Sequence, residues 1–134
     1  MNRLAGTLVS RESSGAIAKI TVNLGPATVT AVLLEEPSFL PEQGTPVTLC
    51  FKESETALAR GTFEGKLSIR NRLPCTVKSV EDDGVLCRVN LDFSGTPLAA
   101  LITSESARDL GLSAGTQVFA LVKSTEVMIA PEAG

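Results

Sequence analysis

Apolar and polar residues alternate over several short stretches of the chain, which is the pattern of half-buried β-strands. Between residues 19 and 24 the apolar side chains fall on one face (Ile20, Val22, Leu24) and the polar ones on the other (Lys19, Thr21, Asn23). Residues 85–93 alternate in the same way, residues 28–34 are apolar and rich in β-branched residues, and residues 98–102 are apolar. Turn residues such as the Asp-Gly pair at 83–84 separate these stretches. The pattern predicts a mainly β protein.

The pattern of the first half is repeated in the second. Two sets of residues match at a constant offset: Asn2-Arg3-Leu4, Thr7, Ser10, Glu12 and Gly15 with Asn71-Arg72-Leu73, Thr76, Ser79, Glu81 and Gly84. Further on the match resumes two residues out of step, with Lys52 opposite Lys123. An internal duplication of this kind predicts two similar modules, over residues 1–62 and 66–132, joined by a glycine-containing linker.

Each module is expected to contain five strands and one short helix. The predicted strands cover residues 4–10, 16–24, 28–34, 46–52 and 55–59, and then 73–80, 85–93, 98–102, 117–123 and 126–130. The helix falls between the third and fourth strands. In the second module a Thr or Ser N-cap begins it and Gly111 ends it. In the first, two prolines within residues 35–44 allow no more than a helical turn. Five strands with one helix predict two tandem OB-like barrels.

Composition excludes several classes of function. The 134 residues include no His, so neither Ser-His-Asp nor Cys-His catalysis nor an imidazole metal site is available. The three cysteines have no C-x-x-C spacing and are interpreted as reduced, apolar-like residues; a disulfide or redox role is the alternative. There is no signal peptide and no apolar run long enough to cross a membrane, so we expect a cytoplasmic protein without membrane insertion.

Nucleic-acid binding, a common use of OB-folds, is not favoured either. Such sites combine aromatic stacking platforms with a basic groove. This chain has five Phe, no Trp or Tyr, and a net charge of −3. The acidic run Glu81-Asp82-Asp83 falls on a predicted hairpin turn and is expected to be solvated rather than to bind a cation.

Three separated motifs resemble the Mop family of small molybdate-binding OB-like domains, also called TOBE domains. They are Ser68-Ile69-Arg70-Asn71, residues 102–112 and residues 120–127, in that order. Members occur singly, in tandem di-Mop storage proteins, and at the C-terminus of molybdate-responsive repressors and molybdate-transporter ATPases. The resemblance covers nearly all of residues 66–130. It is weaker over 2–59, where Lys52 is kept but Leu34 stands at the position of Thr103.

The resemblance implies a binding protein for molybdate, and for tungstate, rather than an enzyme with a cofactor. Molybdate is a tetrahedral dianion with acceptor oxygens only, so its site needs fixed donors and positive charge. Arg70 offers a fork of donors, Lys123 a compact charge, and the predicted helix N-terminus backbone N–H groups. The implied oxyanion-binding residues are Ser68, Arg70, Asn71, Thr103, Ser106, Lys123 and Ser124. No residue is implied to contact the metal directly.

Each of these residues also has a simpler interpretation. Thr103 and Ser106 could only cap the helix, Arg70 and Lys123 could be solvated charges, and Lys52 is expected to be structural. The implied function is intracellular molybdate storage, homeostasis or sensing. One alternative is a regulatory region of a transporter ATPase or repressor; another is a structural oligomerisation module that binds no anion.

An oligomer is expected for two reasons. Modules of about 65 residues bury too little surface to be stable alone. In addition, the resemblance implies that the basic motif and the Lys123 strand meet across a subunit boundary. We expect a homodimer with two-fold symmetry, and a trimer is the alternative.

Overall fold

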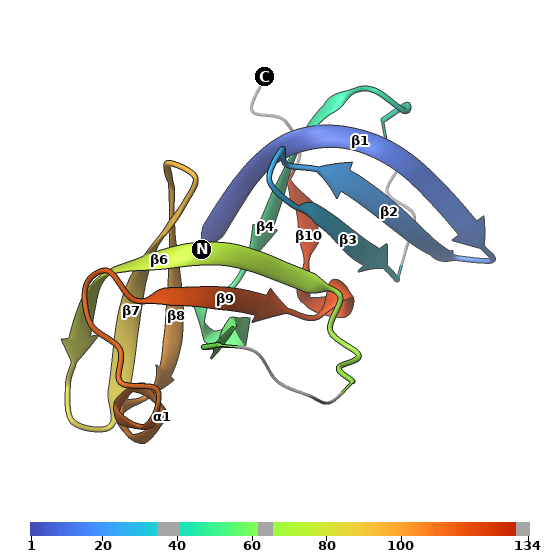
Figure 1. Ribbon diagram of the computed structural model, residues 1–134. Coiled ribbons are helices and arrows are strands. Elements are labelled where there is room, and N and C mark those ends of the chain that lie inside the picture. Colours follow the sequence, from blue (N-terminus) through green and yellow to red (C-terminus); the bar gives the residue numbers. More distant parts are fainter. Residues whose placement is uncertain (35–40, 62–65, 131–134) are drawn as a thin grey trace.

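Two five-stranded antiparallel sheets form the molecule. The structure is a computed structural model that describes residues 1–34, 41–61 and 66–130 (Figure 1). The first sheet has the order β10-β4-β1-β2-β3, with β1 at Asn2–Ser14, β2 at Ile17–Asn23, β3 at Thr28–Leu33, β4 at Pro46–Phe51 and β10 at Met128–Ala130. The second has the order β5-β9-β6-β7-β8, with β5 at Ala57–Ala59, β6 at Asn71–Asp82, β7 at Leu86–Phe93, β8 at Thr96–Thr103 and β9 at Gln117–Val122. The expected mainly β fold is confirmed.

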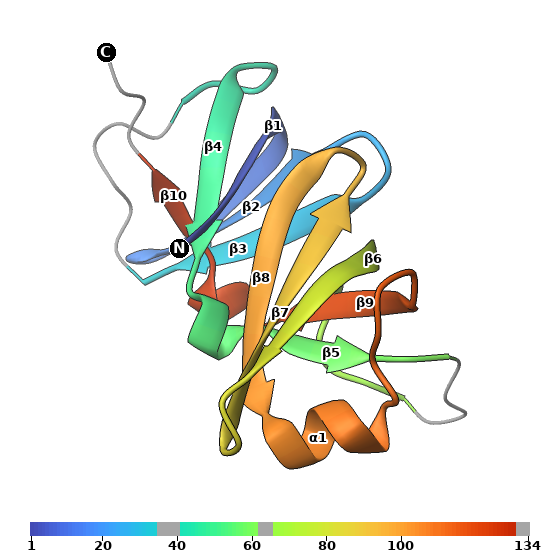
Figure 2. The ribbon, with the colours of Figure 1, turned by 90° about the vertical axis from the view of Figure 1, so that its left-hand side faces the viewer.

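Each sheet takes its outermost short strand from the other half of the chain. β10 pairs with β4, with Ile129 opposite Leu49, and β5 pairs with β9, with Leu58 opposite Ala120 (Figure 2). A 3-10 turn precedes each exchanged strand: η1 at Glu53–Glu55 and η2 at Ser124–Glu126. These turns redirect the chain from one sheet to the other. The boundaries at 1–62 and 66–132 therefore stay a prediction about the sequence repeat, while the sheets themselves interlock across them.

The two halves share one apolar core. Leu4, Ile20, Leu49 and Phe51 of the first half belong to the same buried cluster as Leu73, Leu91 and Val122 of the second. Burying such side chains is the main stabilising contribution to a fold of this size. The three cysteines are free and buried, as their apolar-like interpretation predicts. Burial raises the pKa of the Cys75 thiol to about 11, so this thiol stays protonated at neutral pH.

Some predicted elements differ in their limits. β1 continues to Ser14, which pairs with Ile17, so the turn expected at 13–15 is shifted to Gly15 and Ala16. β8 begins at Thr96 rather than after Pro97, because Ser94 and Gly95 turn the chain alone, both with positive φ. α1 spans Ser104–Asp109, within the helix expected between the third and fourth strands of the second half. The corresponding stretch of the first half, 35–40, lies outside the described residues.

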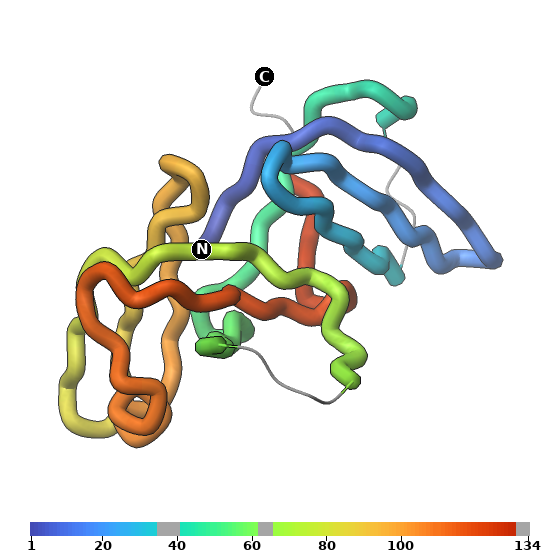
Figure 3. The backbone as a smooth tube through the Cα atoms, viewed as in Figure 1, coloured from blue at the N-terminus to red at the C-terminus, as the bar shows by residue number. Residues whose placement is uncertain are grey.

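Equivalent details recur in both sheets, whose backbone paths can be followed in Figure 3. β1 has a bulge between Leu8 and Ser10, and β6 has one at the matching positions, Val77 and Ser79. η1 packs on β8 of the second sheet, just as η2 packs on β3 of the first. Structure and sequence therefore agree on which residues of the two halves are equivalent.

Candidate functional site

Three of the residues expected to bind an oxyanion line one pocket. Ser68, Lys123 and Ser124 surround a space of about 190 Å³, together with Ile69 and Thr125. The pocket lies where the segment before β6 meets the end of β9. It brings together three hydroxyl-bearing residues and an exposed ammonium group from segments more than fifty residues apart in sequence. No carboxylate occurs among the described residues that line it.

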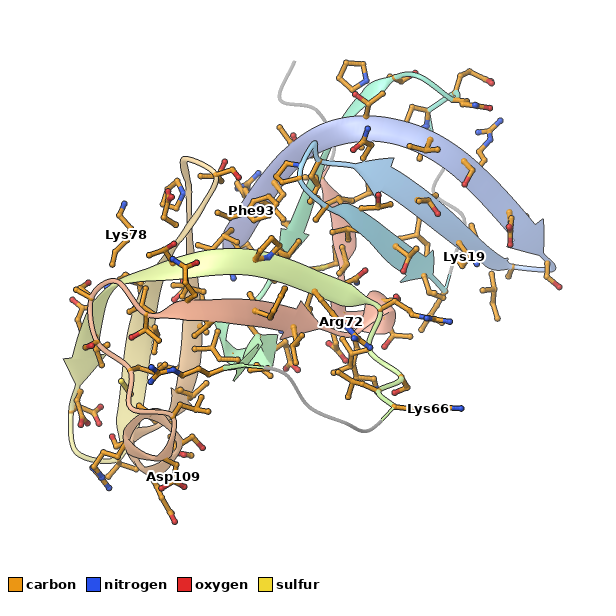
Figure 4. All side chains as sticks on the ribbon, viewed as in Figure 1. Lys19, Lys66, Arg72, Lys78, Phe93 and Asp109 are labelled. Atoms are coloured by element: carbon orange, nitrogen blue, oxygen red, sulfur yellow. The ribbon has the colours of Figure 1, made fainter. Side chains whose placement is uncertain are left out.

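A wider depression of about 590 Å³ adjoins this pocket through Ser68, which lines both. Its other lining residues include Lys66, Arg70 and Arg72, so the surface beside Ser68 is strongly basic. Arg72 also shapes the segment: its guanidinium donates to the carbonyl of Ile69 at 3.1 Å and of Leu67 at 3.3 Å. Figure 4 labels Lys66 and Arg72 on this side of the molecule. The segment is thus held in place by one arginine while Arg70 remains exposed.

Ser124 is held from the other sheet. Its hydroxyl lies 2.8 Å from the hydroxyl of Thr30 on β3. Asn71 fixes the same residue, since its Nδ2 donates to the Thr30 carbonyl at 2.9 Å and its Oδ1 accepts from the Thr30 N–H at 2.8 Å. The Asn71 side chain is fully buried. We expected Asn71 among the direct ligands, but both ends of its side-chain amide are hydrogen-bonded to the backbone of Thr30, so within one chain Asn71 holds β3 against the start of β6.

Thr103 and Ser106 lie elsewhere. Thr103 caps α1: its Oγ1 accepts from the Ser106 N–H at 3.1 Å and donates to the Ser106 hydroxyl at 2.8 Å. α1 lies at the opposite end of the second sheet from η2 in both ribbon views (Figures 1 and 2). One chain therefore does not bring these hydroxyls to Lys123, and the N-cap interpretation describes what they do within it.

The expected division of the site between subunits stays a prediction. The resemblance implied that the basic motif and the Lys123 strand meet between subunits. Within one chain, Ser68 and Lys123 already line the same pocket. The reason is the antiparallel pairing of β6 with β9, in which Asn71 lies opposite Val122, so the residues just before β6 and just after β9 are neighbours.

A carboxylate occupies the equivalent place in the first half. Lys52-Glu53 matches Lys123-Ser124 in the repeat, so Glu53 stands where the second half has Ser124. Both Glu53 oxygens accept from Arg88 of β7, Oε1 from Nε at 3.0 Å and Oε2 from Nη2 at 3.1 Å. The hydrogen bonds from Arg88 are the main cause that lowers the pKa of Glu53. Sequence reasoning missed this pair, although the Glu-for-Ser exchange beside a matching lysine was a visible signal.

The acidic turn is structural. Asp82 Oδ1 accepts from the N–H of Gly84, and Asp83 Oδ1 accepts from those of Val85 and Leu86. Hydrogen bonds of this kind lower the pKa of both carboxyls, with Ser104 contributing most at Asp82. Among the described residues no group of three His, Cys, Asp or Glu side chains is placed to hold a metal ion. Within 1–34, 41–61 and 66–130, no helix has the length and apolar character needed to cross a membrane.

Comparison with known proteins places the chain in a family. The TOBE domain model matches residues 67–129, which contain every predicted binding residue. A probable molybdenum-pterin-binding protein of Haemophilus influenzae is 32% identical over 68 residues, and the chain covers 99% of its length. The chain belongs to the Mop/TOBE family. MopA of Rhodobacter capsulatus, a molybdenum-pterin-binding protein, is 44% identical over 66 residues.

Two further relatives of this Mop/TOBE protein differ in the share of their length that this chain covers. The molybdenum import ATP-binding protein ModC of Brucella abortus is 45% identical over 82 residues, but the chain covers only 23% of its length. The cytoplasmic molybdate-binding protein ModG, solved with molybdate bound, superposes with a TM-score of 0.90 at 28% identity, covering 96% of this chain and 94% of that one. The superposition on ModG confirms the predicted pair of OB-like units.

Proposed function

We propose that this Mop/TOBE protein binds molybdate, and tungstate, at the pocket formed by Ser68, Lys123 and Ser124, with Arg70 at its edge. The observation that carries the proposal is that these residues, distant in sequence, line adjoining spaces on one basic surface. ModG and the molybdenum-pterin-binding relatives support the choice of ligand.

The chemistry of the pocket fits a fully deprotonated oxyanion. Hydroxyls and an ammonium group can all donate to the four oxygens of a tetrahedral dianion. The described lining contains no carboxylate, so it offers no anionic acceptor for the P–OH of a protonated phosphate. The protein should therefore bind molybdate and tungstate in preference to phosphate. It should not separate molybdate from tungstate strongly, because the two ions have the same charge and nearly the same shape.

The role that follows is binding without catalysis, in storage, homeostasis or sensing of molybdate in the cytoplasm. ModG is described as cytoplasmic, which supports that location. A second candidate is a regulatory region of a transporter ATPase, because ModC aligns with 60% of this chain. Anion binding is common to both roles. A purely structural oligomerisation module would show none.

A homo-oligomer, dimeric or trimeric, would complete the donor set. Thr103 and Ser106 lie away from Lys123 within one chain, so their hydroxyls would have to reach the anion from a neighbouring copy. Ligand binding and association would then strengthen each other. Sedimentation with and without molybdate tests this: association should tighten with the anion. A monomer that binds molybdate with unchanged affinity at nanomolar protein would show that one chain suffices.

Calorimetric titration with molybdate, tungstate, sulfate and phosphate tests the function itself. Arg70→Ala and Lys123→Ala should each weaken molybdate binding about ten- to a hundredfold, since a charged hydrogen bond contributes roughly 1.5–3 kcal/mol. Lys78→Ala is the matched control, because Lys78 is an exposed cation of β6 on the opposite side of the view in Figure 4. A well-folded protein that shows no heat and no thermal shift with millimolar molybdate would remove the proposal.

A further inference from the structure

The carboxylate of Glu53 is an anion held by the protein's own side chains. Its contacts indicate how an anion could be held beside Ser124, the equivalent residue of the second half. Its carboxylate is held by both the Nε and Nη2 atoms of Arg88, at 3.0 and 3.1 Å. Arg88 also lies 3.6 Å from Glu81, its cross-strand partner on β6. An arginine on the second strand of a sheet thus bridges a neighbouring glutamate and a carboxylate presented by a 3-10 turn from the other half.

The repeat places Lys19 at the position of Arg88. Glu12 pairs with Lys19 across β1 and β2, just as Glu81 pairs with Arg88 across β6 and β7. The cross-strand ion pair recurs, because the Lys19 ammonium lies 3.7 Å from the Glu12 carboxylate. The ion pair with the 3-10 turn does not recur, because the residue at the position of Glu53 is Ser124, whose side chain carries no charge.

Lys19 also lies on the correct face of its sheet. Thr21 pairs with Thr30, and Lys19 is two residues from Thr21, so all three side chains point to the same side. Thr30 contacts Ser124 on that side, at 2.8 Å between hydroxyls. The Lys19 side chain is half exposed, and its pair with the exposed Glu12 is of the weak surface kind. Its flexible stem can therefore turn the ammonium group toward a second anion.

We propose that Lys19 is a further oxyanion-binding residue, which holds the anion beside Ser124 as Arg88 holds the carboxylate of Glu53. This inference rests on the proposed function. A dianion at the pocket would be met by Lys123 from one half of the chain and by Lys19 from the other. The first half would thus contribute to a site whose recognisable motifs all lie in the second.

The proposal predicts that the anion couples the two halves. Lys19 lies on β2 of the first sheet, while Lys123 follows β9 of the second. A dianion held by both would oppose separation of the sheets, so molybdate should raise the melting temperature of the unmodified protein more than that of a Lys19 variant.

The experiment compares Lys19→Gln with Lys78→Gln by calorimetry and thermal shift on the full chain, with molybdate as the probe. Lys19→Gln should weaken binding about tenfold, the loss of one charged hydrogen bond, and reduce the salt dependence of the affinity. Lys78→Gln should change neither. Lys19→Arg should restore most of the affinity, which a merely structural role would not require.

The outcomes separate this inference from the proposed function. If Lys123→Ala loses binding but Lys19→Gln keeps the affinity of the unmodified chain, the assignment of Lys19 is wrong and the pocket stands. If the unmodified chain binds no molybdate, both are overturned. If Lys19→Gln lowers the melting temperature without ligand, the Lys19→Arg variant is decisive. A Lys19→Arg protein with the stability of the unmodified chain but a tenfold weaker affinity for molybdate would also contradict the proposal.

Discussion

The side-chain amide of Asn71 and the backbone of Thr30 are joined by two hydrogen bonds of 2.9 and 2.8 Å. Asn2 makes the same pair of bonds to the backbone of Ala99, each of 2.8 Å. Asn71 and Asn2 each open the first strand of their half, and Thr30 and Ala99 are equivalent positions on the third strands. Two buried asparagines therefore join the two sheets at equivalent points.

Asn71→Ala should lower the free energy of unfolding by about 1–3 kcal/mol, because it leaves the partly buried N–H of Thr30 without its acceptor. Urea denaturation measures this, and Asn2→Ala should show a loss of similar size. If Asn71→Ala instead abolished molybdate binding at unchanged stability, Asn71 would be a direct ligand and its positioning role would be wrong.

Gly6→Ala should destabilise the protein, by about 1–3 kcal/mol for an overpacked interior. A Cβ at Gly6 would lie 2.6 Å from the carbonyl oxygen of Asn23 and 2.6 Å from a methyl carbon of Val22. Neither the backbone of β2 nor a buried valine can move aside easily. Thermal unfolding of the variant checks this, and an unchanged melting temperature would show that β1 and β2 are less closely packed than the structure indicates.

Glu53→Gln should make stability less sensitive to acid. The pKa of Glu53 is lowered from its ordinary 4.5, mainly by the hydrogen bonds from Arg88. A carboxyl with a depressed folded-state pKa contributes stability that is present above its unfolded pKa and is lost as pH falls through the folded one. Between pH 7 and pH 3, the free energy of unfolding measured by denaturant titration should therefore decrease less for Glu53→Gln than for the unmodified protein. Asp82 and Asp83 keep their own acid dependence, so the decline should be reduced and not abolished.

The control for the acid series is Glu105→Gln, which removes an exposed carboxylate of α1. Its stability should follow the unmodified protein over the whole range. Parallel curves for Glu53→Gln and the unmodified protein would mean that the ion pair with Arg88 adds no stability in solution.

Lys52→Ala should change molybdate affinity much less than Lys123→Ala, although the two lysines are equivalent in the repeat. The residue after Lys52 is Glu53, whose carboxylate already occupies the place beside Arg88 and would repel an added dianion. Parallel calorimetric titrations of the two variants measure the difference. Equal losses of affinity would show that the first half provides a ligand through Lys52 after all.

The sequence was enough to predict most strands, because alternating apolar and polar residues indicate a strand buried on one face, and the same pattern occurs in both halves of the chain. It did not predict that β5 and β10 exchange sheets. Both are three-residue strands, and alternation in so short a segment says nothing about which partner it pairs with. The limits of β1 and β8 were missed because turn residues such as Ser13 and Pro97 also occur within paired strands.

The candidate site was predicted in part for a similar reason. The oxyanion-binding residues stay a prediction, but three of them, Ser68, Lys123 and Ser124, line one pocket. The N-cap role of Thr103 was foreseen as an alternative, whereas nothing in the sequence indicated that the Asn71 amide would bind the backbone of Thr30. Lys19 carries no motif at all, and only the contacts of Arg88 in the other sheet draw attention to it.

The location of the anion is tested most directly by diffraction from crystals grown with molybdate, measured at the molybdenum absorption edge. The anomalous difference map should show a peak within contact of Ser68, Lys123 and Ser124. A peak beside Lys52 and Glu53 instead, or none near Lys123, would contradict the account.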